Sequence, residues 1–436
     1  MKIIPLTKET EAAFKAQLSK RATTGYPEQE QAVAEILAAV RERGDDALFS
    51  YAKQFDGVTL TKENLCVTKE EIRAAYEKTD AALIETMKKS AENIRRFHEK
   101  QLRVSWLEPE ADGVMLGQRF TPMELTGVYV PGGTAALSSS VLMNVIPAKV
   151  AGVDQVIMMT PARESEEENR VAGIDAAVLV AADIAGVDTI FRLGGAQAIA
   201  AMAYGTESVP KVDKITGPGN IYVALAKKAV FGHVSIDSVA GPSEVLVLAD
   251  ETAEASFVAA DLLAQAEHDV LASAILITTE VKLAEEVNQK IDEYCETLSR
   301  ADIIRQSLEN YGAIFIAKDE QAMIDAANGI ASEHVEIMTK DPYRTMCGIR
   351  HAGAIFLGPW TPEPVGDYFA GPNHILPTNG TARFFSPLNV DDFIKKTSLI
   401  AYSREALYHV QEDVRRFANA EGLTAHANSI AVRITE

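Results

Sequence analysis

Apolar positions in the first hundred residues recur at the spacing of an amphipathic helix. Residues 27–43 follow this spacing, with Pro27 suited to a helix start and Gly44 suited to a helix stop. Residues 70–101 form a second, longer amphipathic pattern that is rich in Lys and Glu. Neither segment holds a group of side chains that could carry out chemistry. We therefore expect helices that cover a sheet or a partner subunit.

From residue 127 the pattern changes to short apolar runs that alternate with helical segments. Residues 151–154 and 185–188 repeat the sequence Ala-Gly-Val-Asp 34 residues apart, and a predicted strand follows each copy. The Gly of each copy sits where a helix is expected to end. Such alternation predicts a parallel sheet with helices on both faces. The strands are expected at residues 127–130, 155–159, 189–193 and 212–216.

A second α/β set follows, joined to the first near residues 235–242. Its strands are expected at 244–248, 272–278, 312–316, 335–338 and 354–357, and its helices at 253–268, 282–298 and 320–330. Residues 359–387 are rich in Gly and Pro and show no clear structure, and a loop of this length is usually functional. The tail is expected to hold a helix at 405–417 and a short strand at 429–434.

Charge and cysteine content narrow the possible partners and location. The 436 residues include 42 basic and 62 acidic side chains, a formal net charge of −20. Nucleic acids and anionic membranes are bound mainly through Lys and Arg, so we expect neither as a partner. The cysteines Cys66, Cys295 and Cys347 are far apart and odd in number, which is typical of free thiols in a reducing compartment. The chain start lacks the apolar core of a signal peptide, and no apolar run reaches the ~18 residues of a membrane span. These observations predict a soluble, cytoplasmic protein.

Two pairs of polar residues in the second set could carry out chemistry. Gln265 and His268 stand three apart on a predicted helix, so they project from one face, and both residue types can bind a metal. Glu333 and His334 are adjacent between a helix and a strand, where they could act as a general acid and base. A solvated helix face and a capped turn are the simpler alternatives, and neither pair alone decides between them.

Two further pairs lie in predicted loops. Asp367 and His374 belong to the Gly- and Pro-rich segment, which could aim them rigidly at a ligand. Glu421 and His426 follow the last predicted helix. An ordinary polar loop is the alternative for each.

Glycine-rich turns follow several strands of the first set, at residues 132–133, 194–195 and 217–219. Backbone N–H groups at such turns favour phosphate, but a tight turn without a ligand is an equally good interpretation. None of the turns matches the dinucleotide fingerprint G-x-G-x-x-G. No cysteine lies in any of these clusters, so a cysteine nucleophile is disfavoured.

Taken together, these segments resemble the histidinol dehydrogenase family. The matching stretches begin near residue 127 and continue to the C-terminus in the expected order, whereas the helical N-terminal region carries no specific motif. Several long motifs in one order are far more specific than any single cluster, and they favour the functional roles over the simpler alternatives. The motifs are GVYVPGG (127–133), GGAQAIAAMAYGT (194–206), KITGPGNIYV (214–223), AGPSEVLVLAD (240–250), DLLAQAEHD (261–269), SEHVEI (332–337), GDYFAGPNHILPTNGTARFFSPL (366–388) and AEGLTAHANSIAVR (420–433).

The resemblance implies a four-electron oxidation of L-histidinol to L-histidine through L-histidinaldehyde, the last steps of histidine biosynthesis. Two NAD molecules accept one hydride each, and one Zn²⁺ per subunit holds the substrate. The family forms a homodimer with shared active sites, in which the second subunit supplies one zinc ligand.

The family's functional positions carry over residue by residue. The catalytic pair matches Glu333 and His334. The zinc ligands match Gln265, His268, Asp367 and His426, with His426 supplied by the other subunit; the NAD contacts match Tyr129, Gln197 and Asn220; and the substrate contacts match Ser243, Gln265, His268, His334, Asp367, His374, Glu421 and His426.

The expected roles agree with the chemistry of these groups. A neutral His334 suits the base that takes the hydroxyl proton, and Glu333 could take a proton from the water that hydrates the aldehyde. Glu421 could accept a hydrogen bond from the imidazole N–H and so select for the ring. Ser332 stands where the family usually has Pro, which could soften the turn that holds Glu333 but removes no reacting group.

The expected fold class is α/β, with two Rossmann-like parallel-sheet domains, an N-terminal helical region and a small C-terminal helical or extended tail. Residues 1–110 are expected to pack on the core and the dimer partner, 111–238 to bind NAD, 239–375 to carry zinc and the catalytic pair, and 376–436 to reach the partner's site. Three alternatives stay open: a relative that oxidises another small alcohol such as a sulfonated diol, a zinc hydrolase, and a catalytically inert binding protein.

Overall fold

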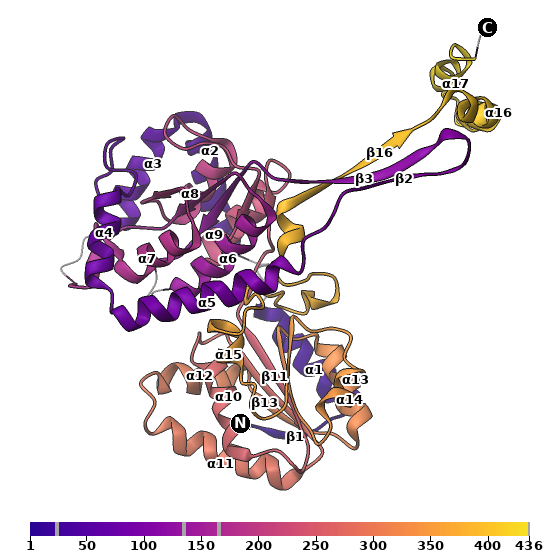
Figure 1. Cartoon of the computed structure of the whole chain (residues 1–436). Helices are drawn as coiled ribbons and strands as arrows, with labels where there is room; N and C mark the ends of the chain where they lie inside the picture. Colours follow the sequence, from indigo (N-terminus) through magenta and orange to yellow (C-terminus); the bar gives the residue numbers. More distant parts are fainter. Residues whose placement is uncertain (22–25, 133–136, 164–166, 435–436) are drawn as a thin grey trace. The chain divides into compact units, whose positions relative to one another are not determined.

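The computed structural model describes residues 1–21, 26–132, 137–163 and 167–434, and Figure 1 shows its elements. The chain divides into two compact units. Unit 1 consists of Met1–Gln101 and Glu124–Phe393, and unit 2 consists of Leu102–Met123 and Ile394–Glu436. Unit 1 contains both parallel sheets, whereas unit 2 contains a small antiparallel sheet and two helices.

The first sheet of unit 1 has five parallel strands. In chain order its elements are β4 (Leu125–Tyr129), α6 (Ser138–Ala151), β5 (Gln155–Met159), α7 (Ala176–Ala185), β8 (Thr189–Phe191), α8 (Gly195–Tyr204), β9 (Lys214–Thr216), α9 (Ile221–Val230) and β10 (Ser235–Ile236). The strand order is β10-β9-β4-β5-β8, so the chain moves outward from β4 and then returns to its other side. Because parallel crossovers are right-handed, α6 and α7 cover one face and α8 and α9 the other. A two-residue hairpin, β6 (Arg170–Val171) and β7 (Ile174–Asp175), precedes α7.

The second sheet of unit 1 has six parallel strands in the order β1-β13-β12-β11-β14-β15. Its strands are β1 (Ile3–Pro5), β11 (Glu244–Ala249), β12 (Ser273–Thr278), β13 (Ala313–Ile316), β14 (His334–Met338) and β15 (Ala354–Leu357). Its helices are α10 (Ala255–Ala266), α11 (Val281–Cys295), α12 (Ala301–Tyr311), α13 (Glu320–Ile330), α14 (Pro342–Met346) and α15 (Glu363–Tyr368). The strand order reverses between β11 and β14.

Alternating side chains of β11 face two separate cores, one on each face of the second sheet. Val245 and Val247 pack with residues of α10, α11 and α12, whereas Leu246 and Leu248 pack with residues of α13. Both sets are fully buried, as expected for a parallel sheet that is covered on both faces. Figure 1 shows the two helical layers on opposite faces of this sheet.

The N-terminal region of unit 1 is helical apart from β1. Its helices are α1 (Lys8–Leu18), α2 (Pro27–Arg43), α3 (Asp45–Tyr51), α4 (Lys69–Lys78) and α5 (Ala81–Glu99), with short turns η1 (Ser19–Arg21) and η2 (Ala52–Asp56). Helix α2 packs on α8 and α9, while α4 and α5 contact α7 and α6. Helices α2, α4 and α5 therefore form an outer layer over the helices of the first sheet, whereas Phe14 of α1 packs in the core of the second sheet.

The two Ala-Gly-Val-Asp repeats end helices as predicted. Gly152 follows α6 and Gly186 follows α7, with φ angles of 89° and 90°. Glycine enters this left-handed region without the Cβ clash of other residues. In the second copy, Asp188 Oδ2 also accepts a hydrogen bond from the backbone N–H of Val156, 2.7 Å away. The second copy of the repeat therefore ends α7 and also contacts β5, the neighbouring strand of the sheet.

Several predicted elements differ from the structure. The pattern at 70–101 is two helices, because Thr79 is extended and the Asp80 carboxylate caps α5 through the Leu83 N–H at 2.9 Å. The loop at 359–387 contains α15 and the short turn η4 (Thr381–Arg383). The strand predicted at 429–434 is wrong, since α17 (Thr424–Ala431) includes residues 429–431 and a turn follows at 432–434. Gly133 lies outside the described residues.

Unit 2 pairs two distant segments of the chain. Strand β3 (Met115–Pro122) lies between β16 (Ile394–Ala401) and β2 (Trp106–Pro109), and both pairings are antiparallel. Helices α16 (Arg404–Ala420) and α17 pack on each other. The sequence patterns did not predict this sheet, because β16 is far from β2 and β3 in the chain. Among the described residues, no helix of the protein is long and apolar enough to cross a membrane.

Candidate active site

Two neighbouring strands of the second sheet begin at or next to residues that the sequence singles out. Glu244 starts β11 and His334 starts β14, and His334 lies opposite Val245 in the ladder. Ser243 and Glu333 directly precede them in the chain. The candidate chemistry therefore lies at the amino ends of β11 and β14, where the strand order reverses. In most open α/β sheets the ligand site is at the carboxyl ends instead.

A cavity of about 220 Å³ lies between this amino edge and the carboxyl end of β9 in the first sheet. Gly217 and Pro218, which follow β9, form part of its wall. Six residues predicted from the sequence also line the cavity: Ser243, His268, Glu333, His334, Asp367 and His374. The fold thus brings together side chains that are more than 130 residues apart in the chain.

The His334 imidazole is oriented by the backbone of the neighbouring strand. Its Nδ1 lies 2.9 Å from the carbonyl oxygen of Glu244, so Nδ1–H is the donor and Nε2 carries the lone pair. Nε2 is buried and has no hydrogen-bond partner among the described residues. It lies 4.0 Å from Oδ1 of Asp367. Burial lowers the pKa of His334 to about 4, which keeps the ring neutral at physiological pH.

The Glu333 carboxylate is held by the same peptide neighbour. Its Oε2 accepts a hydrogen bond from the backbone N–H of Glu244 at 2.9 Å. Burial raises the pKa of Glu333 well above its usual range, and the nearby acid Glu244 adds to the shift. A hydrogen bond from the Ser243 side chain opposes it. A carboxylate in this setting is a stronger proton acceptor than one in water.

His268, Glu363 and Asp367 form the group best suited to hold a cation. Their ligand atoms all lie within 4.8 Å of one another. Burial raises the pKa of Asp367 to about 6, and it raises the pKa of Glu363 well above its usual range. Carboxylates crowded in a buried wall repel each other unless they are protonated or neutralised, so the donor set fits a bound cation. One imidazole nitrogen with carboxylate oxygens is a ligand combination that zinc accepts.

Two details of this group differ from the sequence prediction. Helix α10 ends at Ala266, so His268 lies in the turn beyond it, and Gln265 and His268 do not share a helix face. The sequence analysis also missed Glu363. It stands four residues before Asp367 on α15, so one helical turn places both side chains on the same face. The spacing of two acids at i and i+4 was the available signal, but the segment was expected to be a loop.

Gln265 is fully buried and contacts two residues of the cavity wall. With its amide nitrogen turned toward the surrounding acceptors, that nitrogen lies 3.2 Å from the Glu244 carbonyl oxygen and 3.3 Å from Oε2 of Glu363. It also lies 3.2 Å from His334 Nδ1. The amide orientation is thus fixed by the acceptors around it.

His374 is tied to Asp367 and to the start of α6. Its Nδ1 lies 3.0 Å from the backbone carbonyl oxygen of Asp367, and its Nε2 lies 3.3 Å from Oγ of Ser140. Burial lowers the pKa of His374 to about 4. The ring is therefore neutral, with one nitrogen held by the backbone and the other at the cavity.

The three residues predicted to contact NAD line a second cavity, of about 530 Å³. Tyr129 ends β4, Gln197 lies in the first turn of α8, and Asn220 caps α9 by accepting hydrogen bonds from Tyr222 and Val223 N–H at 3.1 and 3.2 Å. The Tyr129 hydroxyl accepts a hydrogen bond from Gly195 N–H at 3.0 Å. This cavity lies at the carboxyl edge of the first sheet, next to its switch point, where a dinucleotide is expected.

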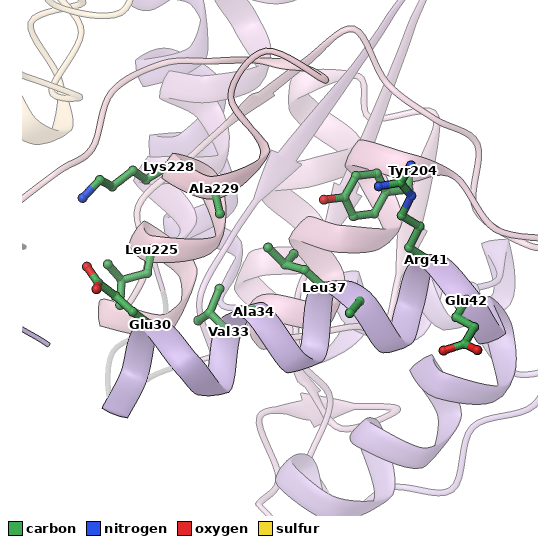
Figure 2. A pocket seen from close by; sticks show the side chains of 11 residues that line it. Glu30, Val33, Ala34, Leu37, Arg41, Glu42, Tyr204, Leu225, Lys228 and Ala229 are labelled. Atoms are coloured by element: carbon green, nitrogen blue, oxygen red, sulfur yellow. The ribbon is translucent and has the colours of Figure 1, made fainter. Parts of the chain in front are cut away.

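A larger hollow, of about 840 Å³, lies between α2, α8 and α9 (Figure 2). Its floor is apolar and includes Val33, Leu37 and Leu225, while charged side chains such as Glu30 and Lys228 stand at its edges. It contains no group of catalytic side chains among the described residues. The predicted site residues therefore lie in a smaller cavity than this hollow, so cavity size does not identify the candidate active site.

The remaining two predicted residues belong to unit 2. Glu421 follows the last turn of α16, and His426 lies in α17. Both side chains are exposed. Their proposed roles depend on a subunit partner and are taken up below.

A neutral buried imidazole beside a group of side chains suited to a cation, with a second cavity at the switch point of a parallel sheet, is an arrangement that fits an oxidoreductase. The family model for histidinol dehydrogenase matches residues 19–434. The chain therefore belongs to the histidinol dehydrogenase family. The zinc hydrolase alternative disagrees with this membership, whereas the resemblance read from the motifs is confirmed.

Similar proteins support the same assignment over nearly the whole chain. A histidinol dehydrogenase from Halalkalibacterium halodurans is 54% identical over 419 residues, 96% of this chain and 97% of that one. One from Bacillus subtilis is 51% identical over 426 residues, 98% of each chain. The crystal structure of histidinol dehydrogenase from Elizabethkingia anophelis has a TM-score of 0.92, with 35% identity, and the match covers 99% of this chain and 97% of that one. The predicted α/β fold class is confirmed.

A buried ion pair supports the strand that orients Glu333 and His334. The Arg21 guanidinium pairs with the Glu244 carboxylate, and both side chains are almost completely buried. Arg21 Nη1 also donates to the Leu271 carbonyl oxygen at 2.9 Å. Burial raises the pKa of Glu244, and the charge of Arg21 opposes that shift. The N-terminal segment is thereby joined to the first residue of β11.

We expect Arg21→Met to destabilise the protein by about 3–5 kcal/mol, because it leaves a buried carboxyl group without its partner. Chemical unfolding of the variant and the parent protein measures the difference. Adding Glu244→Gln to Arg21→Met should recover part of the loss, since a neutral amide is easier to bury. An unchanged unfolding transition in Arg21→Met would contradict a stabilising role for the pair.

Proposed function

We propose that this protein oxidises L-histidinol to L-histidine through L-histidinaldehyde, with NAD as the hydride acceptor in both steps and one Zn²⁺ per subunit. The observation that carries the proposal is a single cavity lined by Ser243, His268, Glu333, Asp367 and the neutral imidazole of His334, which is the proposed base. Family membership supports the reaction and its place at the end of histidine biosynthesis. Glu421 and His374, which match the family's substrate contacts, favour histidinol over a sulfonated diol as substrate.

The residues that would hold zinc are Gln265, His268, Asp367 and His426 of the partner subunit. The crowded carboxyl groups around His268 support a cation at this position. When bound, zinc holds the substrate through its amine and imidazole nitrogens, which are good zinc ligands. Ser243 and His374 line the same cavity and would contact the substrate there.

His334 is the proposed base for the alcohol oxidation. Its Nδ1–H is held by the Glu244 carbonyl, so Nε2 is the atom that takes the hydroxyl proton. The absence of a hydrogen-bond partner for Nε2 among the described residues leaves the lone pair available to the substrate. Glu333 is the proposed acceptor of the proton from the water that hydrates the aldehyde. Its Oε2 is held by the backbone N–H of Glu244.

The second cavity is the proposed NAD site, with contacts from Tyr129, Gln197 and Asn220. NAD supplies the acceptor for the hydride in each oxidation. Oε1 of Gln197 is buried and has no hydrogen-bond partner among the described residues. An unsatisfied buried acceptor of this kind is expected to bind a donor group on a ligand. The roles proposed for residues 111–238 and 239–375 follow from these two cavities.

Unit 2 supports the proposed homodimer because it has almost no core of its own. Its only buried side chains among the described residues are Ala406, Ala418 and Ala427. Large apolar side chains of the unit are exposed instead, including Ile400 at 73% and Phe417 at 74%. A segment with so little buried surface requires a partner to cover it. We propose that a second copy covers unit 2, and that Glu421 and His426 then complete the partner's site.

We also propose that the protein works in the cytoplasm. The thiols of Cys66, Cys295 and Cys347 are all free, which suits a reducing compartment.

The first test is the stoichiometry of NADH formation with purified, zinc-loaded protein. We expect two NADH per L-histidinol consumed, followed by absorbance. A chelator should abolish the activity and added zinc should restore it. Activity with another diol or amino alcohol, but none with histidinol, would retain the fold and reject the proposed substrate.

We expect His334→Ala to lower kcat by about 10²–10⁴-fold, the usual contribution of a general base. Zinc content should stay equal to that of the parent protein, since His334 is not among the proposed ligands. Steady-state kinetics and metal analysis measure the two properties on the same sample. Full activity in this variant would overturn the assignment of the base.

Mixing two inactive variants tests the shared site. His334→Ala lacks the base, and His426→Asn lacks the ligand that the partner supplies. In a mixed dimer one site then has both defects and the other has none, so random assortment should restore about one quarter of the parent activity. No recovery after verified subunit exchange would place His426 in the site of its own subunit or outside the site.

A further inference from the structure

Glu363 is a buried acid in the cavity wall that belongs to the cluster with His268 and Asp367 but is not among the proposed zinc ligands. Only 2% of the surface of Glu363 is exposed. Oε2 lies 3.3 Å from the amide nitrogen of Gln265, and Oε1 lies 4.0 Å from His334 Nε2. The carboxyl group therefore lies between a proposed zinc ligand and the proposed base.

We propose that Glu363 is a positioning residue that fixes the orientation of the Gln265 amide. It accepts a hydrogen bond from the amide nitrogen, which leaves the amide oxygen as the end available to the cation. The inference rests on the proposed function, because it takes Gln265 to be a zinc ligand.

The chemistry of an amide makes such a residue necessary. The two ends of a Gln side chain have nearly the same shape, but only the oxygen has a lone pair that can bind a metal. The surrounding acceptors decide which end faces the cation. Outer groups of this kind orient metal ligands and are often as important as the ligands themselves.

Glu363 is the acceptor best suited to this task. His334 Nδ1 uses its hydrogen to donate to the Glu244 carbonyl at 2.9 Å, so Nδ1 has no lone pair for Gln265. The Glu244 carbonyl is shared between His334 and Gln265. A carboxylate is also a stronger acceptor than a neutral carbonyl. Glu363 is thus the acceptor that Gln265 does not share with His334 Nδ1.

The backbone of Glu363 is held in place by a second buried acid, Glu336. Its backbone N–H donates to Oε1 of Glu336 at 2.9 Å, and Glu336 is 1% exposed. The side chains of Asp261 and Glu336 are in turn hydrogen-bonded to each other. Asp261 lies on α10, the helix that carries Gln265. Glu363 is therefore connected through Glu336 and Asp261 to α10, the helix that carries its partner Gln265.

The test measures the affinity of the full-length protein for Zn²⁺ alone, by competition with a chromophoric chelator and without NAD or histidinol. We expect Glu363→Ala to weaken zinc binding by about 10–100-fold, the usual effect of losing such an outer contact. Glu363→Gln should restore most of the affinity, because its carbonyl oxygen can accept the same hydrogen bond. Glu285→Ala, which removes an exposed acid from α11, is the control for the loss of one negative charge.

A double-mutant comparison separates positioning from direct binding. If Glu363 acts through Gln265, then Glu363→Ala should have little further effect in a Gln265→Ala background. An equal loss in both backgrounds would overturn the proposal and make Glu363 a ligand in its own right. Zinc affinity unchanged by Glu363→Ala, or not restored by Glu363→Gln, would also overturn it.

The proposed zinc set has a separate point of failure. Zinc affinity unchanged by Gln265→Ala would show that Gln265 is not a ligand, and the positioning role would fall with that assignment. Reduced affinity in Gln265→Ala without any effect of Glu363→Ala would keep the zinc set and reject only the role of Glu363. The absorption spectrum of Co²⁺-loaded protein supplies a readout independent of turnover, and it should change in Glu363→Ala and return in Glu363→Gln.

Discussion

The peptide groups of Glu244 orient both members of the proposed catalytic pair. Its N–H binds Oε2 of Glu333, and its carbonyl binds Nδ1 of His334. This is possible because Glu244 is the first residue of β11, where the neighbouring strand β14 also begins. Its side chain is held by Arg21 from the N-terminal segment. The geometry of the site thus depends on the position of Glu244, whose N–H, carbonyl oxygen and side chain are each held by a different residue.

The location of the site follows from the way the two sheets meet. The carboxyl end of β9 in the first sheet and the amino ends of β11 and β14 in the second form opposite walls of one cavity. The neighbouring cavity, with Tyr129 and Gln197, belongs to the first sheet. In the proposed function, NAD therefore binds at the edge of the first sheet, and the substrate binds in the cavity between the two sheets.

The sequence predicted the parallel strands well because their signals are local. Residues 155–159 and 354–357 were predicted with the bounds that the structure has. Strand β1 was missed because three residues give no pattern by themselves. The sheet of unit 2 was missed because its strands β3 and β16 pair across more than 270 residues of the chain. Of the two acids on α15, only Asp367 was predicted, because it lies in a recognisable motif. Glu363 could be recognised only from the packing that buries it. The end of α10 before His268 is likewise set by tertiary contacts and not by helical spacing.

The lack of a core in unit 2 has a consequence for how activity depends on protein concentration. The three alanines that are buried among the described residues of unit 2 form too small a core to stabilise it, and the proposed second copy would supply the missing buried surface. For a homodimer with shared sites, mass action then governs activity as well as assembly. In the proposed dimer, dilution below the dissociation constant removes the partner's Glu421 and His426 from every site at once, even though each chain keeps its own Glu333 and His334. If the sites are shared in this way, a newly made chain is inactive until it meets a second copy.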